Sequence, residues 1–345
     1  MGTGPPGAKP LRMDEVIPTL DLRDRSDPVR REAFLAGLRR ALFDPGAFYL
    51  TGHGIHEEDS DAMMQLARRF FALPAEDRDA IDIVHSPHFR GYTQVGYERT
   101  QGAVDWREQL DVGLELPARK RVPGDPAYLE LQGPNQWPAA LPELRPAVLG
   151  WMDGLGRVAD ALLAAICEAY GLAPSTFRHA FAVDPHVHLK IIRYPASWPV
   201  SSEQGVGAHK DYGFLTLLLQ DDVGGLQIAD GRGGFSDVPP RRGTFIVNLG
   251  ELFEVATGGV MTATMHRVRR PPSGAERISI PYFHNPRLDY SVAPIDLPKE
   301  HAQARQPVDP TNPLFAEYGR NALKGWLRAH PRVAERYYGA PALSD

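Results

Sequence analysis

The chain has 345 residues, 43% hydrophobic and 23% charged, with a formal net charge of −5 at pH 7. This length and balance are ordinary for a globular protein with a sizeable core. The charges are well mixed, which excludes the strongly basic surface of a protein that binds nucleic acid or an anionic membrane. No apolar stretch approaches the ~18 residues of a transmembrane span.

The N-terminal part reads as a leader followed by short helices and strands. Residues 1–14 lack the apolar core of a signal peptide, so we expect a flexible leader. A β-prone run covers 15–22. Helical spacing then predicts a helix that Pro45 and Gly46 stop, ahead of the strand "AFYLTG". The apolar positions of that helix are Phe34, Leu35, Leu38, Leu42 and Phe43.

A second helix is predicted in "EEDSDAMMQLARRFFAL", with Asp59 or Ser60 as its N-cap. Residues 82–138 are irregular and rich in aromatic residues, as functional loops often are. A long helix over roughly 142–172 follows and contains the single cysteine, Cys167. The apolar pattern around Cys167 indicates a buried structural residue. One cysteine cannot form an intrachain disulfide, which favours a cytoplasmic location.

From residue 186 the pattern changes to short β-rich runs separated by turns. These runs are "HLKIIRYP", "FLTLLLQ", "GLQIAD", "GTFIVNLG", "ATMHRVRR" and "RISIPYFHNP". Their spacing predicts an antiparallel sandwich or barrel, and "GRGG" at 231–234 predicts a hairpin turn. The stretch "PLFAEYGRNALKGWLRAHPRVAERYYG" predicts one amphipathic C-terminal helix. Helices first and strands later indicate the α+β class.

Two hydrophilic groups stand just ahead of one of these runs. His209 and Asp211 are two positions apart, so in an extended chain their side chains project from the same face. His266 follows Asp211 after 54 intervening residues and lies in a β-like stretch. Two imidazoles and one carboxylate from adjacent strands occupy one face of an octahedral metal, the arrangement of non-haem Fe(II) oxygenases. A solvated loop is the alternative for the H-x-D pair alone.

A cation follows within an apolar strand. Arg277 and Ser279 are again two positions apart, in "RISIPYF". Arginine offers a fork of donors suited to a carboxylate, and serine adds a hydroxyl. A buried cation is costly unless it meets an anion. Arg277 is therefore predicted to bind either a ligand carboxylate or an internal acidic residue.

The combined pattern H-x-D-x54-H-x10-R-x-S resembles the signature of the isopenicillin N synthase-like family of 2-oxoglutarate and Fe(II)-dependent dioxygenases. "VIPTLDL…AFYLTGHGI", "LKIIRYP" and "VGGLQI" follow the same resemblance, which covers roughly residues 15–330. It implies a double-stranded β-helix, or jelly roll, framed by helices. The implied modules are 15–138 (N-terminal), 139–185 (framing helix), 186–290 (catalytic core) and 291–345 (C-terminal helical segment).

The resemblance also implies roles for individual residues. His209, Asp211 and His266 would bind Fe(II), and Arg277 and Ser279, with Tyr194, would hold the distal carboxylate of 2-oxoglutarate. The implied reaction uses O2 to oxidise, most simply to hydroxylate, a small organic molecule, and releases succinate and CO2. Residues that we expect near the substrate are Arg90, Tyr92, Arg107 and Phe283.

Three other functions stay open at this point. An oxidase of the isopenicillin N synthase type uses Fe(II) and O2 without 2-oxoglutarate, and its R-x-S motif would bind the substrate. Formation of ethylene from 2-oxoglutarate shares the same metal ligands. A non-catalytic jelly roll that binds a metal or a small molecule would need neither the complete triad nor the cation, and the presence of both disfavours it.

Overall fold

Most of the strands belong to two facing sheets. The computed structural model describes residues 17–197, 203–230, 233–272, 274–298 and 314–339, so the predicted leader at 1–14 lies outside the described residues. The larger sheet has the strand order β1-β2-β12-β9-β14-β7-β6-β3, antiparallel except for the β1–β2 pair. Its strands are β1 (Thr19–Asp21), β2 (Ala47–Thr51), β3 (Gly91–Thr93), β6 (Glu108–Gly113), β7 (His188–Tyr194), β9 (Leu215–Gln220), β12 (Phe245–Leu249) and β14 (Arg277–His284).

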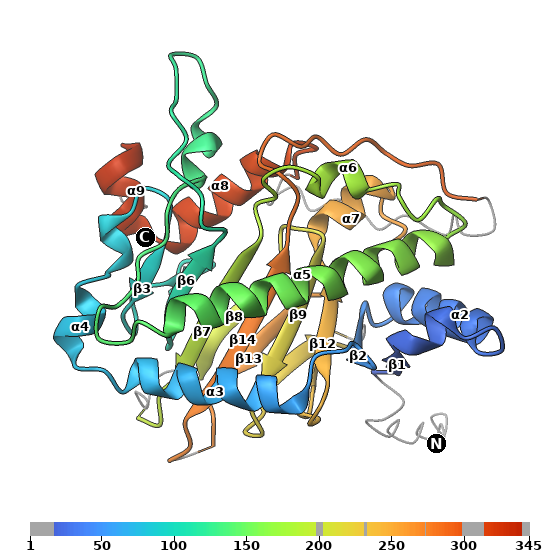
Figure 1. The fold of residues 1–345 in the computed structure, drawn as a ribbon, viewed down its shortest axis with the longest axis horizontal. Helices are drawn as coiled ribbons and strands as arrows, with labels where there is room; N and C mark the ends of the chain where they lie inside the picture. Colours follow the sequence, from blue (N-terminus) through green and yellow to red (C-terminus); the bar gives the residue numbers. More distant parts are fainter. Residues whose placement is uncertain (1–16, 198–202, 231–232, 273, 299–313, 340–345) are drawn as a thin grey trace, which may run out of the picture.

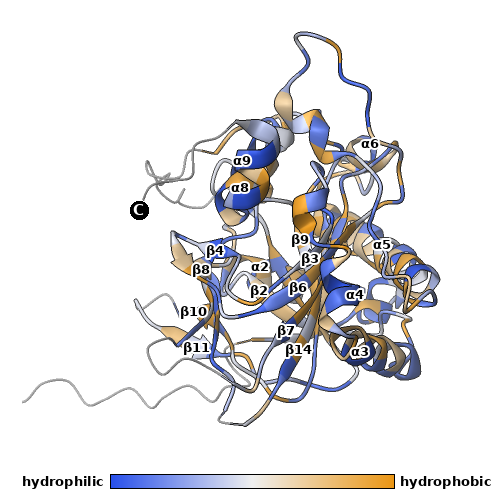
Figure 2. Ribbon diagram, turned by 90° about the vertical axis from the view of Figure 1, so that its left-hand side faces the viewer, coloured by the Kyte–Doolittle hydropathy of each residue, from blue (hydrophilic) through white to orange (hydrophobic). Residues whose placement is uncertain are grey.

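The smaller sheet faces it with the order β11-β10-β13-β8. Its strands are β8 (Gln204–His209), β10 (Leu226–Ala229), β11 (Phe235–Asp237) and β13 (His266–Arg269). Figure 2 shows this sheet on one side, β6, β7 and β14 in the middle, and helices α3 (Glu57–Phe71) and α5 (Leu144–Ala169) on the other side. The predicted α+β fold with a jelly-roll core framed by helices is confirmed.

Alternating side chains divide the larger sheet into an outer and an inner face. On β7, Leu189 and Ile191 pack into the large core beneath the helices, whereas Ile192 and Tyr194 join a second core between the sheets. Because both faces are covered, strands such as β9, "LTLLLQ", and β12, "FIVNL", are nearly continuous apolar runs. The polar side chains on the inner face therefore stand out as candidates for chemistry.

The remaining helices frame this core. In Figure 1, α5 and α3 lie across the larger sheet, and α2 (Arg31–Phe43) lies beside β1 and β2. At the far end, α8 (Tyr318–Ala329) and α9 (Pro331–Tyr338) close over η3 (Ala127–Leu131) and η2 (Ile83–His85). The other short elements are η1 (Leu22–Ser26), α4 (Ala75–Asp79), β4 (Arg99–Thr100), β5 (Ala103–Val104), α6 (Arg178–Phe181) and α7 (Glu251–Ala256). No helix in the described ranges is long and apolar enough to cross a membrane.

Several local predictions need correction. The second helix begins at Glu57 after His56, so neither Asp59 nor Ser60 caps it. The predicted single C-terminal helix is two helices, because Pro331 lacks the N–H that would continue α8 and instead occupies the first turn of α9. Phe43 is 54% exposed, at the last turn of α2.

The segment predicted to be irregular, 82–138, contributes two strands to the larger sheet. β6 pairs with β7, and β3 pairs with β6. The larger sheet takes strands from both sides of residues 138 and 185, and the module boundaries at 138, 185 and 290 stay predictions. β10 and β11 pair antiparallel as a hairpin, although Gly231 and Arg232 of its turn lie outside the described residues.

Candidate metal centre

The two histidines of the predicted triad meet across the smaller sheet. His209 ends β8 and His266 begins β13, and they are register partners with ring centroids 4.3 Å apart. Asp211 follows β8 by two residues. One carboxylate oxygen, Oδ1, lies 3.9 Å from the Nε2 atom of each histidine. The candidate ligand atoms of all three residues lie within 4.8 Å of one another, so the cluster has the dimensions of a metal site.

The hydrogen bonds of both imidazoles leave Nε2 available to a metal. His209 Nδ1 lies 2.8 Å from the carbonyl oxygen of Gly207, and His266 Nδ1 lies 2.8 Å from that of Thr264. Because a carbonyl only accepts, each Nδ1 carries the proton and each Nε2 keeps its lone pair. Burial, together with the neighbouring His266, lowers the pKa of His209 to about 4, so this ring is neutral at pH 7.

The second oxygen of Asp211 is held by the larger sheet. Thr216 Oγ1 donates to Oδ2, and Asn248 Nδ2 donates to the same oxygen at 2.8 Å. Burial opposes ionisation, but the two imidazoles and these donors outweigh it, so the pKa of Asp211 lies below its usual value. The carboxylate is therefore charged, with one oxygen fixed and the other facing the histidines. The hydrogen bonds of Thr216 and Asn248 to Asp211 could not be predicted from the sequence, because the strand pattern shows only that each residue is polar.

Arg277 is fully buried on the inner face of β14. Its Nη1 donates to Ser279 Oγ at 3.1 Å, and its Nη2 donates to Gln220 Oε1 at 3.2 Å. Its guanidinium carbon lies 4.9 Å from the ring centroid of Tyr194, which is opposite Arg277 on β7. Within the described ranges, no carboxylate lies within ion-pair distance of Arg277, although Asp221, which accepts from the Ile278 N–H, is close enough for its pKa to be affected by this cation. Arg277 Nε and Gln220 Nε2 have no hydrogen-bond partner. These contacts leave the cation equipped for an anionic ligand.

Comparison with known proteins identifies the family. One family profile, described as "non-haem dioxygenase in morphine synthesis N-terminal", matches residues 17–140, and another, "2OG-Fe(II) oxygenase superfamily", matches 185–286. A 2-oxoglutarate-dependent dioxygenase, frbJ, of Dothideomycetidae sp. is 34% identical over 95% of this chain and 93% of its own length. The chain belongs to the 2OG-Fe(II) oxygenase superfamily. This oxygenase is therefore an oxidoreductase that uses Fe(II), 2-oxoglutarate and O2.

Other proteins resemble this chain in sequence or in fold. A homoarginine-6-hydroxylase of Glycine max is 33% identical over 78% of this chain and 82% of its own length. A putative 2OG-Fe(II) oxygenase of Caulobacter crescentus has a TM-score of 0.72 at 26% identity, covering 89% of this chain and 98% of that one. A Neurospora crassa protein whose structure was solved with alpha-KG and thymine shares the fold, with a TM-score of 0.74 at 24% identity, over 91% and 99% of the two chains.

The oxygenase contains a buried group of charged residues within electrostatic reach of the triad. We call it the charge cluster, and it consists of Glu98, Asp105, Arg107, Asp111 and Lys190. Lys190 Nζ lies 3.1 Å from Asp111 Oδ1 and 3.2 Å from Glu98 Oε1. Arg107 Nη2 lies 2.9 Å from Glu98 Oε2 and 3.4 Å from Asp105 Oδ2. The positive charge of Arg107 contributes to the lowered pKa of His209, so the cluster is within electrostatic reach of the candidate metal centre.

The strand register connects this cluster to the triad. Thr216, which holds Asp211, is opposite Phe283 on β14, and Phe283 is opposite His188 on β7. His188 Nε2 bonds to Asp111 Oδ1 at 2.9 Å. The ring centroids of His188 and Trp326, on α8, lie 4.8 Å apart in an edge-to-face arrangement. One row on the inner face thus runs from the triad past Phe283 to the charge cluster and α8.

The other two predicted substrate residues lie elsewhere. Tyr92 donates its hydroxyl to Glu108 and accepts from Arg78 Nη1 at 3.1 Å, beside Phe70. Arg90 donates to the carbonyl oxygens of His88 at 2.8 Å and Leu131 at 3.2 Å. Neither set of contacts includes the triad, so a substrate role for these two stays a prediction without structural support.

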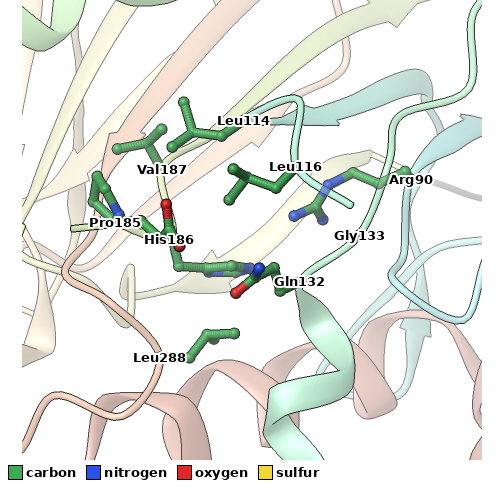
Figure 3. Close-up of a pocket in the computed structure, with 10 residues that line it drawn as sticks. Arg90, Leu114, Leu116, Gln132, Gly133, Pro185, His186, Val187 and Leu288 are labelled. Carbon is green, nitrogen blue, oxygen red and sulfur yellow. The ribbon is translucent and has the colours of Figure 1, made fainter. Parts of the chain in front are cut away.

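Arg90 also lines a separate small cavity, shown in Figure 3. Its volume is about 20 Å³, which is room for a single water molecule. Its walls include His186, Gln132 and Leu288, and none of the triad residues. This cavity is too small for an organic substrate, and it lies apart from the triad.

Proposed function

We propose that His209, Asp211 and His266 bind the Fe(II) of this oxygenase, and that Arg277, Ser279 and Tyr194 bind 2-oxoglutarate. We further propose that the enzyme hydroxylates a small polar organic molecule. The ligand set supports the metal assignment, because two neutral imidazoles and one carboxylate suit Fe(II) and leave coordination positions open. The predicted cytoplasmic location of the enzyme stays a prediction from its cysteine usage.

The observation that carries the co-substrate assignment is that the guanidinium of Arg277 is fully buried and has no ion-pair partner among the described residues. A guanidinium buried without an ion-pair partner is costly, and a bidentate carboxylate removes that cost. Ser279 and Gln220 orient the guanidinium, and Gln220 Nε2 is a second buried donor without a partner. The face of Tyr194 fixes the plane of approach. A dicarboxylate that reaches from this pocket to the triad fits 2-oxoglutarate.

The substrate proposal rests on the row from Phe283 to the charge cluster. Phe283 offers an apolar surface next to Thr216, whereas Lys190, Asp111 and Arg107 offer polar contacts. His188 Nδ1 and Gln109 Oε1 are buried acceptors without partners. A wall of this kind suits a substrate that combines hydrogen-bonding groups with an aliphatic carbon. The named functions of the relatives, which include homoarginine hydroxylation, are consistent with such a substrate.

In the proposed reaction, Fe(II) bound at the triad would enable O2 to oxidise a substrate C–H bond, with one oxygen atom going to the substrate and the other to succinate as 2-oxoglutarate loses CO2. The protein's own residues hold the reactants. Thr216 and Asn248 keep one oxygen of Asp211 occupied, so the other oxygen faces the histidines. Phe283 and Trp326 place apolar rings along the row between the triad and the charge cluster. Arg277 fixes the far end of the co-substrate, so that its keto acid end points toward the triad.

The test is an anaerobic titration of the Fe(II)-loaded protein with 2-oxoglutarate, monitored by the weak visible charge-transfer band of a chelated keto acid. In Arg277→Ala, we expect the dissociation constant of 2-oxoglutarate to rise at least about 30-fold, because truncating one partner of a buried charge pair costs about 2–5 kcal/mol. Arg277→Lys keeps the charge but loses the fork, so its loss should be smaller.

Arg269→Ala is the matched control, since the Arg269 side chain is 53% exposed on β13 and its removal should leave the titration unchanged. An Arg277→Ala protein that binds 2-oxoglutarate as tightly as the wild type would refute the assignment of Arg277. Absence of the band in wild-type protein that carries stoichiometric iron would refute the proposed co-substrate pocket as a whole.

A further inference from the structure

The strand that carries His209 contains one extra residue immediately before this histidine. His266 pairs with His209 and Val268 pairs with Val206, so two steps along β13 correspond to three steps along β8. The extra residue makes a β-bulge at Gly207 and Ala208. A bulge leaves a backbone group unpaired in the ladder and redirects the side chain that follows, and bulges are frequent next to active sites.

Both polar backbone groups of Gly207 have partners outside the ladder. Its carbonyl oxygen accepts the Nδ1 proton of His209 at 2.8 Å, and its N–H donates to Asp105 Oδ1 at 3.2 Å. Asp105 is 102 residues earlier in the chain and is fully buried. The residue whose carbonyl orients the iron-ligand histidine is therefore itself held, through its N–H, by a distant carboxylate, and Asp105 directly follows the β4–β5 hairpin.

The carboxylate of Asp105 is fully occupied. Oδ1 also accepts from Gln204 Nε2 at 2.9 Å, and Oδ2 accepts from Thr100 Oγ1 at 2.7 Å. A Cβ atom at Gly207 would lie only 2.9 Å from Thr100 Cγ2, so the hairpin packs directly against the bulge. These contacts fix the position of Gly207 from two directions, and any residue larger than glycine would push the hairpin away.

We propose that Asp105 is a positioning residue for the Fe(II) centre. It holds the backbone of Gly207 through the N–H, and the carbonyl of Gly207 fixes the tautomer and orientation of His209. Asp105 also contacts Arg107, so it joins the metal-ligand strand to the charge cluster. The proposal rests on the assignment of His209 as an iron ligand made under Proposed function. The hydrogen bonds of Asp105 include none of the triad side chains, so Asp105 acts on His209 through Gly207.

The experiment measures the dissociation constant of Fe(II) alone by anaerobic titration, and the energy of the charge-transfer band after 2-oxoglutarate is added. In Asp105→Ala, we expect Fe(II) affinity to fall about 10- to 100-fold, as when other partners of metal-ligating histidines are removed. The band should also shift or broaden, because the ring of His209 loses its fixed orientation. A loss of general stability alone would leave the band energy unchanged.

Two further variants make the result decisive. Asp105→Asn keeps one acceptor oxygen for Gly207, so Fe(II) affinity within about threefold of wild type is expected. Asp82→Ala is the matched control, because Asp82 is also buried but caps η2, away from the triad. This control should lose stability and keep both the Fe(II) affinity and the band.

The possible outcomes separate the two proposals. A folded Asp105→Ala protein with wild-type Fe(II) affinity and an unchanged band overturns the role of Asp105. If Asp105→Ala does not fold, Asp105→Asn decides, and a loss of Fe(II) affinity above about 10-fold in that variant overturns the role of the Gly207 bond. Failure of the wild-type protein to bind Fe(II), or retention of Fe(II) by His209→Ala, would instead overturn the metal centre itself.

Discussion

Replacing Lys190 by methionine removes the cation at the centre of the charge cluster. Lys190 is the only described side chain that ion-pairs with both Glu98 and Asp111, at 3.2 and 3.1 Å, and its ammonium lies 5.0 Å from the ring centroid of Trp326. Its side chain is only 12% exposed. Methionine keeps the length and apolar contacts of the lysine stem, so the substitution isolates the loss of charge.

Breaking a buried ion pair by removing one partner costs about 3–5 kcal/mol. We expect the lower end, about 3 kcal/mol, because Glu98 keeps Arg107 and Asp111 keeps His188. Unfolding entropy scales to about 0.7 kcal/mol per kelvin for a chain of 345 residues, so Tm should fall by about 4 °C at pH 7. Lys120→Met, at an exposed position, is the control and should leave Tm unchanged.

The dependence of this Tm difference on pH is a sharper test of the role of the buried charges. Burial opposes ionisation of Glu98 and Asp111, but their cationic neighbours outweigh it and lower the pKa of both. A lowered pKa contributes stability above the unfolded value near 4, and this stability is lost as pH falls through the folded value. Without Lys190, both pKa values rise, so the variant takes up protons earlier on acidification.

The Tm difference between wild type and Lys190→Met should therefore be widest at pH 7 and narrow as the pH falls below about 4. Thermal unfolding of the metal-free proteins, followed by circular dichroism at pH 7 and at about pH 3, measures this difference. A difference that is independent of pH, or a variant more stable than wild type at pH 7, would refute the reasoning from uncompensated buried carboxylates.

Two further predictions concern other buried groups. Glu254 accepts hydrogen bonds from Lys210, which lies between His209 and Asp211 in the chain, and from the Ala263 N–H at 2.6 Å. Glu254→Ala should therefore weaken Fe(II) binding about tenfold, measured by competition with a chelator. An unchanged dissociation constant for Fe(II) would contradict this. Burial raises the pKa of Cys167 to about 11, so the native protein should resist a thiol reagent such as DTNB at pH 8 and react after unfolding in urea. Rapid reaction of the folded protein would show that Cys167 is accessible.

The triad was within reach of sequence analysis because its signal is local. His209 and Asp211 are two positions apart, and His266 lies in a recognisable strand, so strand periodicity and metal chemistry are enough to bring them together. The same holds for Arg277 and Ser279. The structure adds what periodicity does not carry, namely the one-residue bulge before His209 and the absence of an ion-paired carboxylate for Arg277 among the described residues.

The charge cluster could not be predicted because the ion pairs that Lys190 makes in it are non-local. Glu98 and Lys190 are 92 residues apart, and they meet only because β6 joins β7 in the larger sheet. The sequence of β6, "EQLDVG", carries three polar residues in six, so its strand signal is weak. Tyr92 shows the converse case, since an aromatic residue in a polar segment has the composition of a binding site, and its ring packs against Phe70 of α3.

Contacts between distant parts of the chain limit how the oxygenase can vary. The ligands of the proposed Fe(II) site come from residues 209–266, whereas Glu98, Asp105 and Arg107 come from the flanks of the β4–β5 hairpin. Because Asp105 contacts both Arg107 and the bulge at Gly207, a substitution in this region acts on the substrate wall and on His209 together. We therefore expect a substitution in this region to change substrate selectivity and iron affinity together. Changes at Phe283, which the register places beside Thr216 without a hydrogen bond to Asp211, should alter selectivity while sparing the metal.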